Sequence, residues 1–122
     1  MVGLFNYPKR KMRKLVDDGD YEAALELGHN LEKEKKYQYD EQLLFIIGSI
    51  YYILGDADKS LEYLDKSLEI SSNDTEALML KANVHIHLKE KNIAIDCCRK
   101  ILEIDEENWQ VKDLLSDLEN SD

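Results

Sequence analysis

Two adjacent cysteines and two closely spaced histidines are the side chains of this sequence best suited to metal or nucleophilic chemistry. Cys97 and Cys98 have no further cysteine and no CxxC spacing, so neither a zinc site nor a disulfide framework is indicated. His85 and His87 are two residues apart, whereas two ligands on one helix face need a spacing of three or four. We therefore predict no metal site, with Cys98 a buried apolar residue and Cys97 a more exposed thiol.

Other patterns that support catalysis are missing from the sequence. There is no Gly-rich phosphate loop, no nucleophile elbow and no pair of carboxylates on a predicted inward face. The many carboxylates lie on the polar faces of predicted helices, where water solvates them. The sequence thus predicts no catalytic residue, no cofactor and no enzymatic activity.

The densest cluster of charge is the basic run PKRKMRK, residues 8–14. It carries +5, while residues 15–122 carry −15, and an acidic body disfavours nucleic-acid binding because phosphates need basic partners. The run could contact an anionic membrane surface as part of residues 1–14, bind nucleic acid or act as a nuclear-import signal. It could also be a solvated helix face with Met12 inward, or be attracted to the acidic body of a second copy or of a partner.

Composition indicates a folded, all-helical chain. Hydrophobic residues make up 43% and charged residues 34%, which disfavours disorder, and a single Pro with five Gly leaves few points where helices must break. The longest uncharged apolar run, residues 43–54, is too short to cross a bilayer, and no signal-peptide pattern opens the chain. We expect a soluble, cytoplasmic protein.

A 34-residue period organises the sequence. Shifting residues 41–74 onto 75–108 places Leu44 on Leu78, and the Gly-Asp pair at residues 55–56 has a counterpart 36 residues earlier. Periods in this range are typical of stacked supersecondary units that bury their apolar faces against one another. The chain is therefore predicted to be a repeat array.

Within the repeats, hydrophobic periodicity predicts seven helices that form three hairpins and a C-terminal capping helix. Asp40 is expected to cap one helix, and Asn73 with Glu76 to form a capping-box-like pair at another. The approximate helix ranges are 8–18, 21–35, 41–54, 57–70, 74–88, 91–104 and 107–118. The predicted organisation is an apolar arm (1–7), a repeat domain (8–119; repeats at about 5–38, 41–74 and 75–108, capping helix 109–119) and a tail (120–122).

At these positions the chain resembles the tetratricopeptide repeat, a 34-residue helix–turn–helix with a large residue, Leu-Gly and Tyr early and Ala, an aromatic residue, Ala and Pro later. The matching positions of the middle repeat are Leu44, Ile47-Gly48, Tyr51, Ser60, Leu64, Ser67 and Ser72. Those of the third are Leu78, Lys81-Ala82, His85, Ala94, Cys98, Ile101 and Glu106, and those of the first are Pro8, Lys11-Met12, Leu15, Ala24, Gly28, Leu31 and Lys36. Because Lys81 and His85 replace apolar residues, the third repeat is expected to be softer than the second.

The resemblance implies a right-handed α-solenoid in which the first helices of successive repeats line a concave groove. Transferred to this chain, the groove residues begin with Asn6. The candidates are Lys9, Arg10, Arg13, Gln42, Phe45, Ile46, Ser49, Tyr52, Ile53, Glu76, Met79, Leu80, Asn83, Ile86 and His87. The predicted groove has an apolar centre and one basic end.

The same resemblance indicates which ligands this groove would take. Family members that hold the C-terminal carboxylate of chaperones use Lys and Asn, then Asn, then Lys and Arg, whereas the corresponding residues here are Lys9, Arg13, Ile46, Glu76 and Leu80. A carboxylate clamp is therefore rejected. We predict a non-enzymatic interaction module that binds an apolar or amphipathic segment of a partner protein. The alternative is a structural module that self-associates through the same apolar surface.

Overall fold

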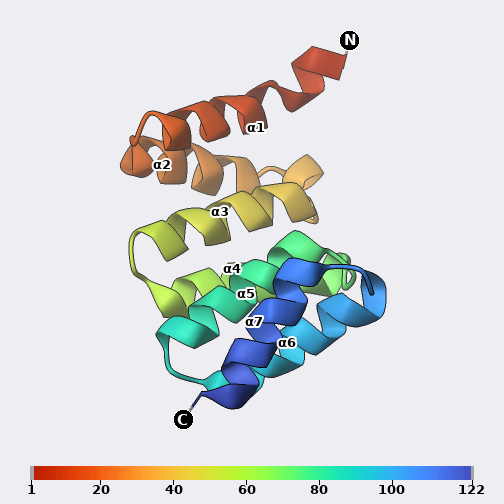
Figure 1. Ribbon diagram of the computed structural model, residues 1–122. Helices are drawn as coiled ribbons and strands as arrows, with labels where there is room; N and C mark the ends of the chain where they lie inside the picture. Colours follow the sequence, from red (N-terminus) through yellow and green to blue (C-terminus); the bar gives the residue numbers. More distant parts are fainter. Residues whose placement is uncertain (1, 122) are drawn as a thin grey trace. The chain divides into compact units, whose positions relative to one another are not determined.

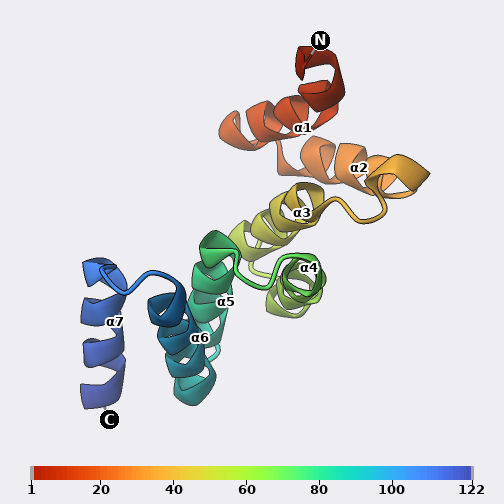
Figure 2. The same ribbon diagram turned by 90° about the vertical axis from the view of Figure 1, so that its right-hand side faces the viewer.

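Helices account for all the regular structure of residues 2–121, the part of the chain that the computed structural model describes; side chains are described for residues 7–121. The chain divides into two units, residues 1–70 and residues 71–122. Unit 1 contains α1 (Val2–Asp17), α2 (Tyr21–Glu32), the 3-10 helix η1 (Lys35–Tyr37), α3 (Glu41–Ile53) and α4 (Ala57–Ile70), and unit 2 contains α5 (Thr75–His87), α6 (Lys91–Ile104) and α7 (Trp109–Asn120) (Figures 1 and 2). The predicted all-α class is confirmed.

The first helix begins earlier than the sequence suggests. We expected it to start near Pro8, but α1 begins at Val2 and contains Pro8. Proline lacks the amide that would bond to the carbonyl of residue 4, so the loss is one hydrogen bond early in the helix, and the ladder resumes after it. Residues 2–7 are thus part of α1. The side chain of Asn6 lies outside the described residues.

Side-chain caps determine where several helices begin. The Asp40 carboxylate accepts a hydrogen bond from the Leu43 amide at 3.1 Å, which confirms the predicted cap of α3. At α5 the prediction was wrong by one residue, since Asp74 instead of Asn73 accepts from the amides of Glu76 and Ala77. Asp74 directly precedes the first helical residue, which is the position from which a short carboxylate reaches these amides.

The hairpin turns place one residue of each hairpin in the left-handed region. Gly19 has φ +80° and Gly55 φ +82°, as expected for residues that end a helix. In the third hairpin the same place is taken by Lys89, with φ +61°. A side chain with a Cβ is disfavoured in this conformation, so the third turn is strained where the first two are not.

Replacing Lys89 with Gly is therefore expected to stabilise the protein by about 0.5–1 kcal/mol, because relief of the left-handed strain exceeds the added flexibility of the unfolded chain. Urea denaturation followed by circular dichroism measures the change. As a control, Lys100→Gly on the exposed face of α6 should destabilise by about 1 kcal/mol, since glycine weakens a helix interior. A loss of stability in Lys89→Gly would contradict this account.

Close helix crossings in unit 1 depend on two glycines. A Cβ on Gly48 would lie 3.2 Å from Leu64 Cγ, and a Cβ on Gly28 would lie 2.8 Å from Met12 Cε. The short distance between α3 and α4 also lets Ser60 Oγ donate to the Gly48 carbonyl at 2.8 Å. A small residue at each of these two positions thus lets the neighbouring helices approach closely.

In unit 2, α6 packs against both α5 and α7. Cys98 is fully buried, as predicted, but Cys97 is only 6% exposed, so the expectation of a more exposed thiol was wrong. The two side chains diverge by about 100° around the helix, and a neighbouring helix on each side of α6 covers both directions. Burial raises the pKa of the Cys98 thiol.

Candidate functional site

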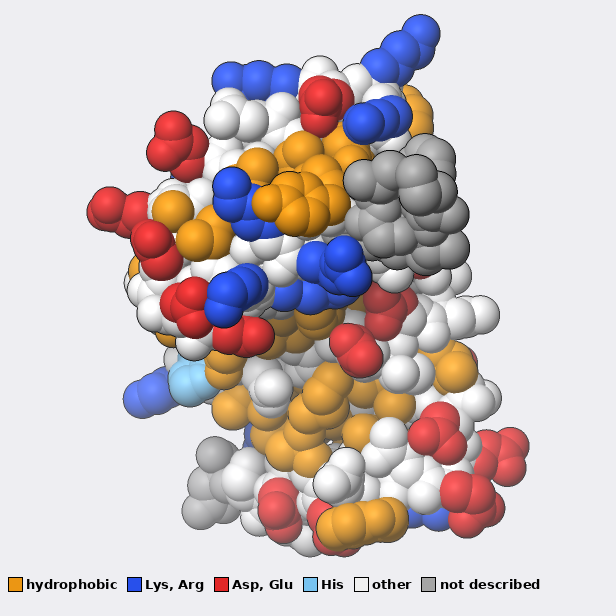
Figure 3. Space-filling model, turned by 90° about the horizontal axis from the view of Figure 1, so that it is seen from above, with side chains coloured by type: hydrophobic (Ala, Val, Ile, Leu, Met, Phe, Trp, Pro, Cys, Tyr) orange, Lys and Arg blue, Asp and Glu red, His pale blue; other side chains and the backbone are white. Residues whose placement is uncertain are grey.

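The predicted groove residues are divided between the units: those of α1 and α3 lie in unit 1 and those of α5 in unit 2. Each group borders a pocket within its own unit. On the face seen in Figure 3, apolar side chains are interleaved with side chains of both charges. The single groove across both groups stays a prediction.

The first pocket, about 260 Å³ in volume, lies between α1 and α3 of unit 1. We call it the α1–α3 pocket. Its lining residues are Arg13, Val16, Asp17, Phe45, Ile46, Ser49 and Ile50. Ile46 and Ile50 are buried and form the floor, while Phe45 and Val16 are half-buried on the walls. Four of the predicted groove residues, namely Arg13, Phe45, Ile46 and Ser49, are thus brought together around one apolar cavity.

Charged residues stand at the rim of this pocket. Arg13 and Asp17 are both exposed and lie one helical turn apart on α1. Neither forms an ion pair or a side-chain hydrogen bond with any residue of the described part of the chain. The Ser49 hydroxyl, in contrast, already donates a hydrogen bond to the Phe45 carbonyl at 2.8 Å. The rim therefore offers one cation and one anion that a ligand can reach.

Lys9 lies outside the pocket, and its side chain links α1 to the start of α3. Only 9% of the residue is exposed, and its Nζ is 2.9 Å from Asp40 Oδ2 and 3.1 Å from Gln42 Oε1. Its ammonium is thus satisfied internally. Of the other predicted residues of unit 1, Arg10, Tyr52 and Ile53 do not line the pocket.

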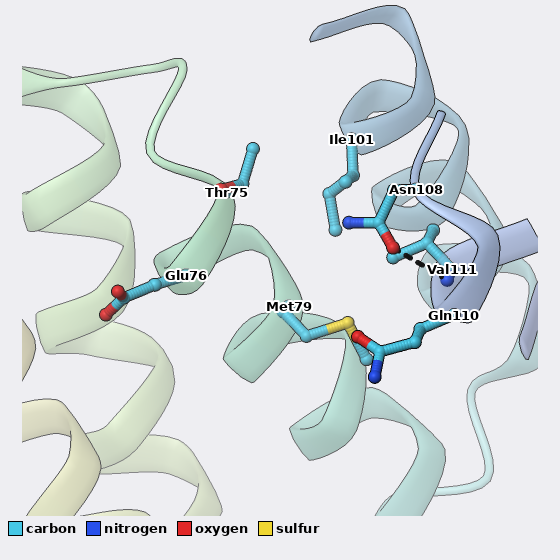
Figure 4. Close-up of a pocket in the computed structure, with 7 residues that line it drawn as sticks. All are labelled: Thr75, Glu76, Met79, Ile101, Asn108, Gln110 and Val111. Carbon is cyan, nitrogen blue, oxygen red and sulfur yellow. Dashed lines mark hydrogen bonds between the residues drawn. The ribbon is translucent and has the colours of Figure 1, made fainter. Parts of the chain in front are cut away.

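The second pocket, about 290 Å³ in volume, lies between α5 and α7 in unit 2. We call it the α5–α7 pocket. Its lining residues are Thr75, Glu76, Met79, Ile101, Asn108, Gln110 and Val111. Figure 4 shows Met79 directed toward Gln110, whereas the Glu76 carboxylate extends in the other direction. Asn108 is held in place because its side-chain oxygen accepts from the Val111 amide at 3.1 Å.

Two of the predicted groove residues, Glu76 and Met79, line the α5–α7 pocket, but the other predicted residues of α5 do not. Those other residues are Leu80, Asn83, Ile86 and His87. Sequence reasoning missed Gln110, although a signal for it existed. The 34-residue period that relates Gln42 to Glu76 leads one step further to Gln110, at the start of the helix that we expected only to cap the array.

A polar aromatic cluster was also missed. His29 Nε2 is 2.9 Å from the Tyr51 hydroxyl, and Glu32 Oε1 is 3.0 Å from His29 Nδ1 and 2.9 Å from the Tyr63 hydroxyl, which donates to it. The Tyr51 and Tyr63 rings stack with centroids 5.9 Å apart. Burial, followed by the hydrogen bond to Glu32, raises the pKa of Tyr63. The cluster joins α2, α3 and α4, and no spacing in the sequence points to it.

The two histidines of unit 2 lie in different environments. His85 is buried, with Nδ1 3.1 Å from Glu90 Oε1, and its Nε2 has no hydrogen-bond partner among the residues with described side chains. His87 is exposed. No group of three potential metal ligands occurs among the residues that the structure describes.

The hairpins α3–α4 and α5–α6 are the part of the chain on which the family assignment rests. The tetratricopeptide repeat model matches residues 41–74 and 75–108, which together are more than half of the chain. The chain belongs to the tetratricopeptide repeat family. The α1–α3 pocket of this tetratricopeptide protein thus lies between the first helices of two successive hairpins. No curated protein matches it by sequence.

Solved structures confirm the tetratricopeptide fold. The type III secretion chaperone SycD of Yersinia enterocolitica, in complex with a peptide of the translocator YopD, is 13% identical with a TM-score of 0.86, covering 95% of this chain and 92% of that one. The first tetratricopeptide domain of Spaghetti (RPAP3), bound to an HSP90 peptide, is 17% identical with a TM-score of 0.83, covering 93% and 88%. The second such domain of human RPAP3, with an HSP70 peptide, is 15% identical with a TM-score of 0.81, covering 93% of each chain.

Among the described residues, no helix combines the length and the apolar character needed to cross a bilayer.

Proposed function

We propose that this tetratricopeptide protein is a protein-interaction module whose α1–α3 pocket receives an apolar side chain from a partner peptide or helix. The observation that carries the proposal is the combination of a buried apolar floor, Ile46 and Ile50, with a reachable rim cation, Arg13. An apolar anchor loses its contact with water in such a pocket, and the rim charge orients the segment that presents it. The structurally similar SycD and RPAP3 domains were solved with peptides, which supports this class of function.

The expected partner segment is amphipathic, not a chain terminus held by its carboxylate. Lys9 is satisfied by Asp40 and Gln42, which removes the cation that such a clamp would need at the start of the groove. At two further clamp positions stand Ile46 and Glu76, an apolar residue and an anion. An acidic residue beside the apolar anchor would pair with Arg13.

The α5–α7 pocket is proposed as a second place for an apolar side chain. Met79, Ile101 and Val111 give it an apolar interior, and the flexible Met79 side chain can adapt to different shapes. The Gln110 amide, which lies beside Met79 in Figure 4, can bond to a peptide backbone. This pocket therefore suits the same class of ligand without requiring a charge on it.

Phe45→Glu is the variant that tests this function. Phe45 is only half-buried on the pocket wall, so the variant should fold, while a carboxylate beside the anchor should weaken partner binding at least about 30-fold, the equivalent of roughly 2 kcal/mol. The measurement is calorimetric titration of a peptide mapped from a partner that wild-type protein captures. Ile70→Glu is the matched control, because it adds the same charge to an exposed residue of α4 that belongs neither to the pocket nor to the predicted groove.

Two results would contradict the proposal: unchanged binding by a folded Phe45→Glu variant, or equal losses in Phe45→Glu and Ile70→Glu. Self-association through the same surface, the rival function, predicts instead that wild-type protein forms oligomers and that Phe45→Glu makes them dissociate. Light scattering of both proteins across a dilution series separates these functions.

A further inference from the structure

Trp109 is the single tryptophan of the chain and is 67% exposed. It is the first residue of α7 and follows the acidic segment 103–107, whose four carboxylates are all exposed. Exposed tryptophans combine a large apolar area with few rotatable bonds, and they are enriched at the centres of protein interfaces. Trp109 lines neither of the pockets described above. Its exposure is therefore not explained by the proposed peptide site.

A third pocket, about 370 Å³ in volume, lies between α1 and α2 of unit 1. Its lining residues are Lys11, Leu15, Ala23, Glu26, Leu27 and Asn30, none of which belongs to the predicted groove. Leu15, Ala23 and Leu27 are half-buried and form an apolar interior contributed by both helices. A cavity of this size accepts one aromatic side chain. We call it the α1–α2 pocket.

Two exposed cations of α1 at the α1–α2 pocket are opposite in charge to the acidic segment before Trp109. Lys11 stands at its rim and Arg10 precedes it on α1, and both side chains are exposed and make no ion pair with described residues. Glu26 is the one acidic residue in the lining. Lys11 and Arg10 carry +2 that no described carboxylate pairs, and residues 103–107 carry −4, so the two segments attract each other. Both halves of a complementary contact are thus present in one sequence.

We propose that Trp109 of one molecule inserts into the α1–α2 pocket of a second copy of this chain, with the acidic segment 103–107 facing Lys11 and Arg10. The contact joins two different surfaces, so it is heterologous, in contrast to a self-complementary contact. It uses residues outside the α1–α3 pocket, which remains open to a partner peptide. This inference is therefore independent of the proposed function.

Intrinsic fluorescence tests the contact directly, because the emission has one tryptophan as its source. Across a dilution series of the full chain, the Trp109 emission should shift to shorter wavelength as the concentration rises, in parallel with an increase in mass measured by sedimentation velocity. Added NaCl should weaken the association, because exposed charges are screened. An emission maximum that is already blue-shifted and does not depend on concentration would overturn the proposal, since Trp109 would then be covered within its own chain.

Variants define the two surfaces separately. Trp109→Ala should abolish the association, and Ala23→Lys should do the same by filling the pocket with a long side chain. Lys11→Glu should weaken association about tenfold, because an attraction becomes a repulsion. Lys100→Glu, the same change on an exposed residue of α6, is the control and should not weaken it, because it adds negative charge next to the segment 103–107. Circular dichroism verifies that each variant folds.

Mixing gives the decisive result. Trp109→Ala retains the pocket and Ala23→Lys retains the tryptophan, so each should be monomeric alone while an equimolar mixture forms one-to-one complexes. Failure of the mixture to associate, or wild-type association by either variant alone, would overturn the proposal. Phe45→Glu should leave self-association unchanged, which distinguishes this contact from oligomers formed through the α1–α3 pocket.

Discussion

Replacing Gly48 with Leu is expected to lower the free energy of unfolding by at least about 2 kcal/mol, as overpacking of a close helix crossing does. A Cβ alone would lie 3.3 Å from the Ser60 carbonyl oxygen and 3.2 Å from Leu64 Cγ. The remaining atoms of a leucine would force α3 and α4 apart and break the hydrogen bond from Ser60 Oγ to the Gly48 carbonyl. The backbone carbonyl cannot rotate away as a flexible side chain can.

Chemical denaturation monitored by circular dichroism gives the size of this effect. Gly48→Ala should change stability much less, since its tight contacts offset the gain in helix propensity, which is worth about 1 kcal/mol. Lys100→Leu is the matched control, because it adds a leucine to an exposed helical residue. If the Gly48→Leu protein were as stable as the wild type, α3 and α4 would have to lie further apart at Gly48 than the 3.3 Å contacts of an added Cβ indicate.

Asp40→Ala is expected to cost about 2–4 kcal/mol, because one carboxylate has two functions. Its Oδ1 accepts from the Leu43 amide and caps α3, and its Oδ2 lies 2.9 Å from Lys9 Nζ. Removing it leaves both an uncapped helix and an ammonium group with little access to water. A buried charge without its partner is more costly than the loss of the pair itself.

Asp74→Ala is the matched control for this variant. Asp74 caps α5 through the Glu76 and Ala77 amides and forms no ion pair in the described structure, so its loss should cost about 1 kcal/mol. Lys9→Met combined with Asp40→Ala should recover part of the stability lost in Asp40→Ala. Equal effects of Asp40→Ala and Asp74→Ala in urea denaturation would mean that the Lys9 pair contributes nothing.

Much of the fold was predictable because it depends on local patterns. The 34-residue period and the glycine turns at Gly19 and Gly55 placed the hairpins, and the ranges predicted for α4 and α6 match the structure. The start of α1 was not predictable, since proline is common in the first turn of a helix and only the structure shows a helix continuing across Pro8. The burial of Cys97 was missed because it depends on two neighbouring helices.

The candidate sites were less accessible to sequence reasoning. The resemblance brought Arg13, Phe45 and Ile46 to one surface, and the structure places all three around the α1–α3 pocket. It could not show that the Lys9 ammonium is already paired within the chain, because its partner is Asp40, 31 residues further along. Hydrophobic periodicity identifies an apolar face, but whether a cation beside that face is reachable depends on tertiary pairing.

Both thiols of the protein lie in unit 2, so their reaction with a reagent can report how fast that unit opens. Cys97 and Cys98 are both buried in α6, and unit 1 contains no cysteine. A thiol reagent therefore reacts only when α6 is uncovered, and its rate follows the opening of unit 2. The unmodified sequence thus allows the opening of unit 2 to be timed separately from that of unit 1, without an added label.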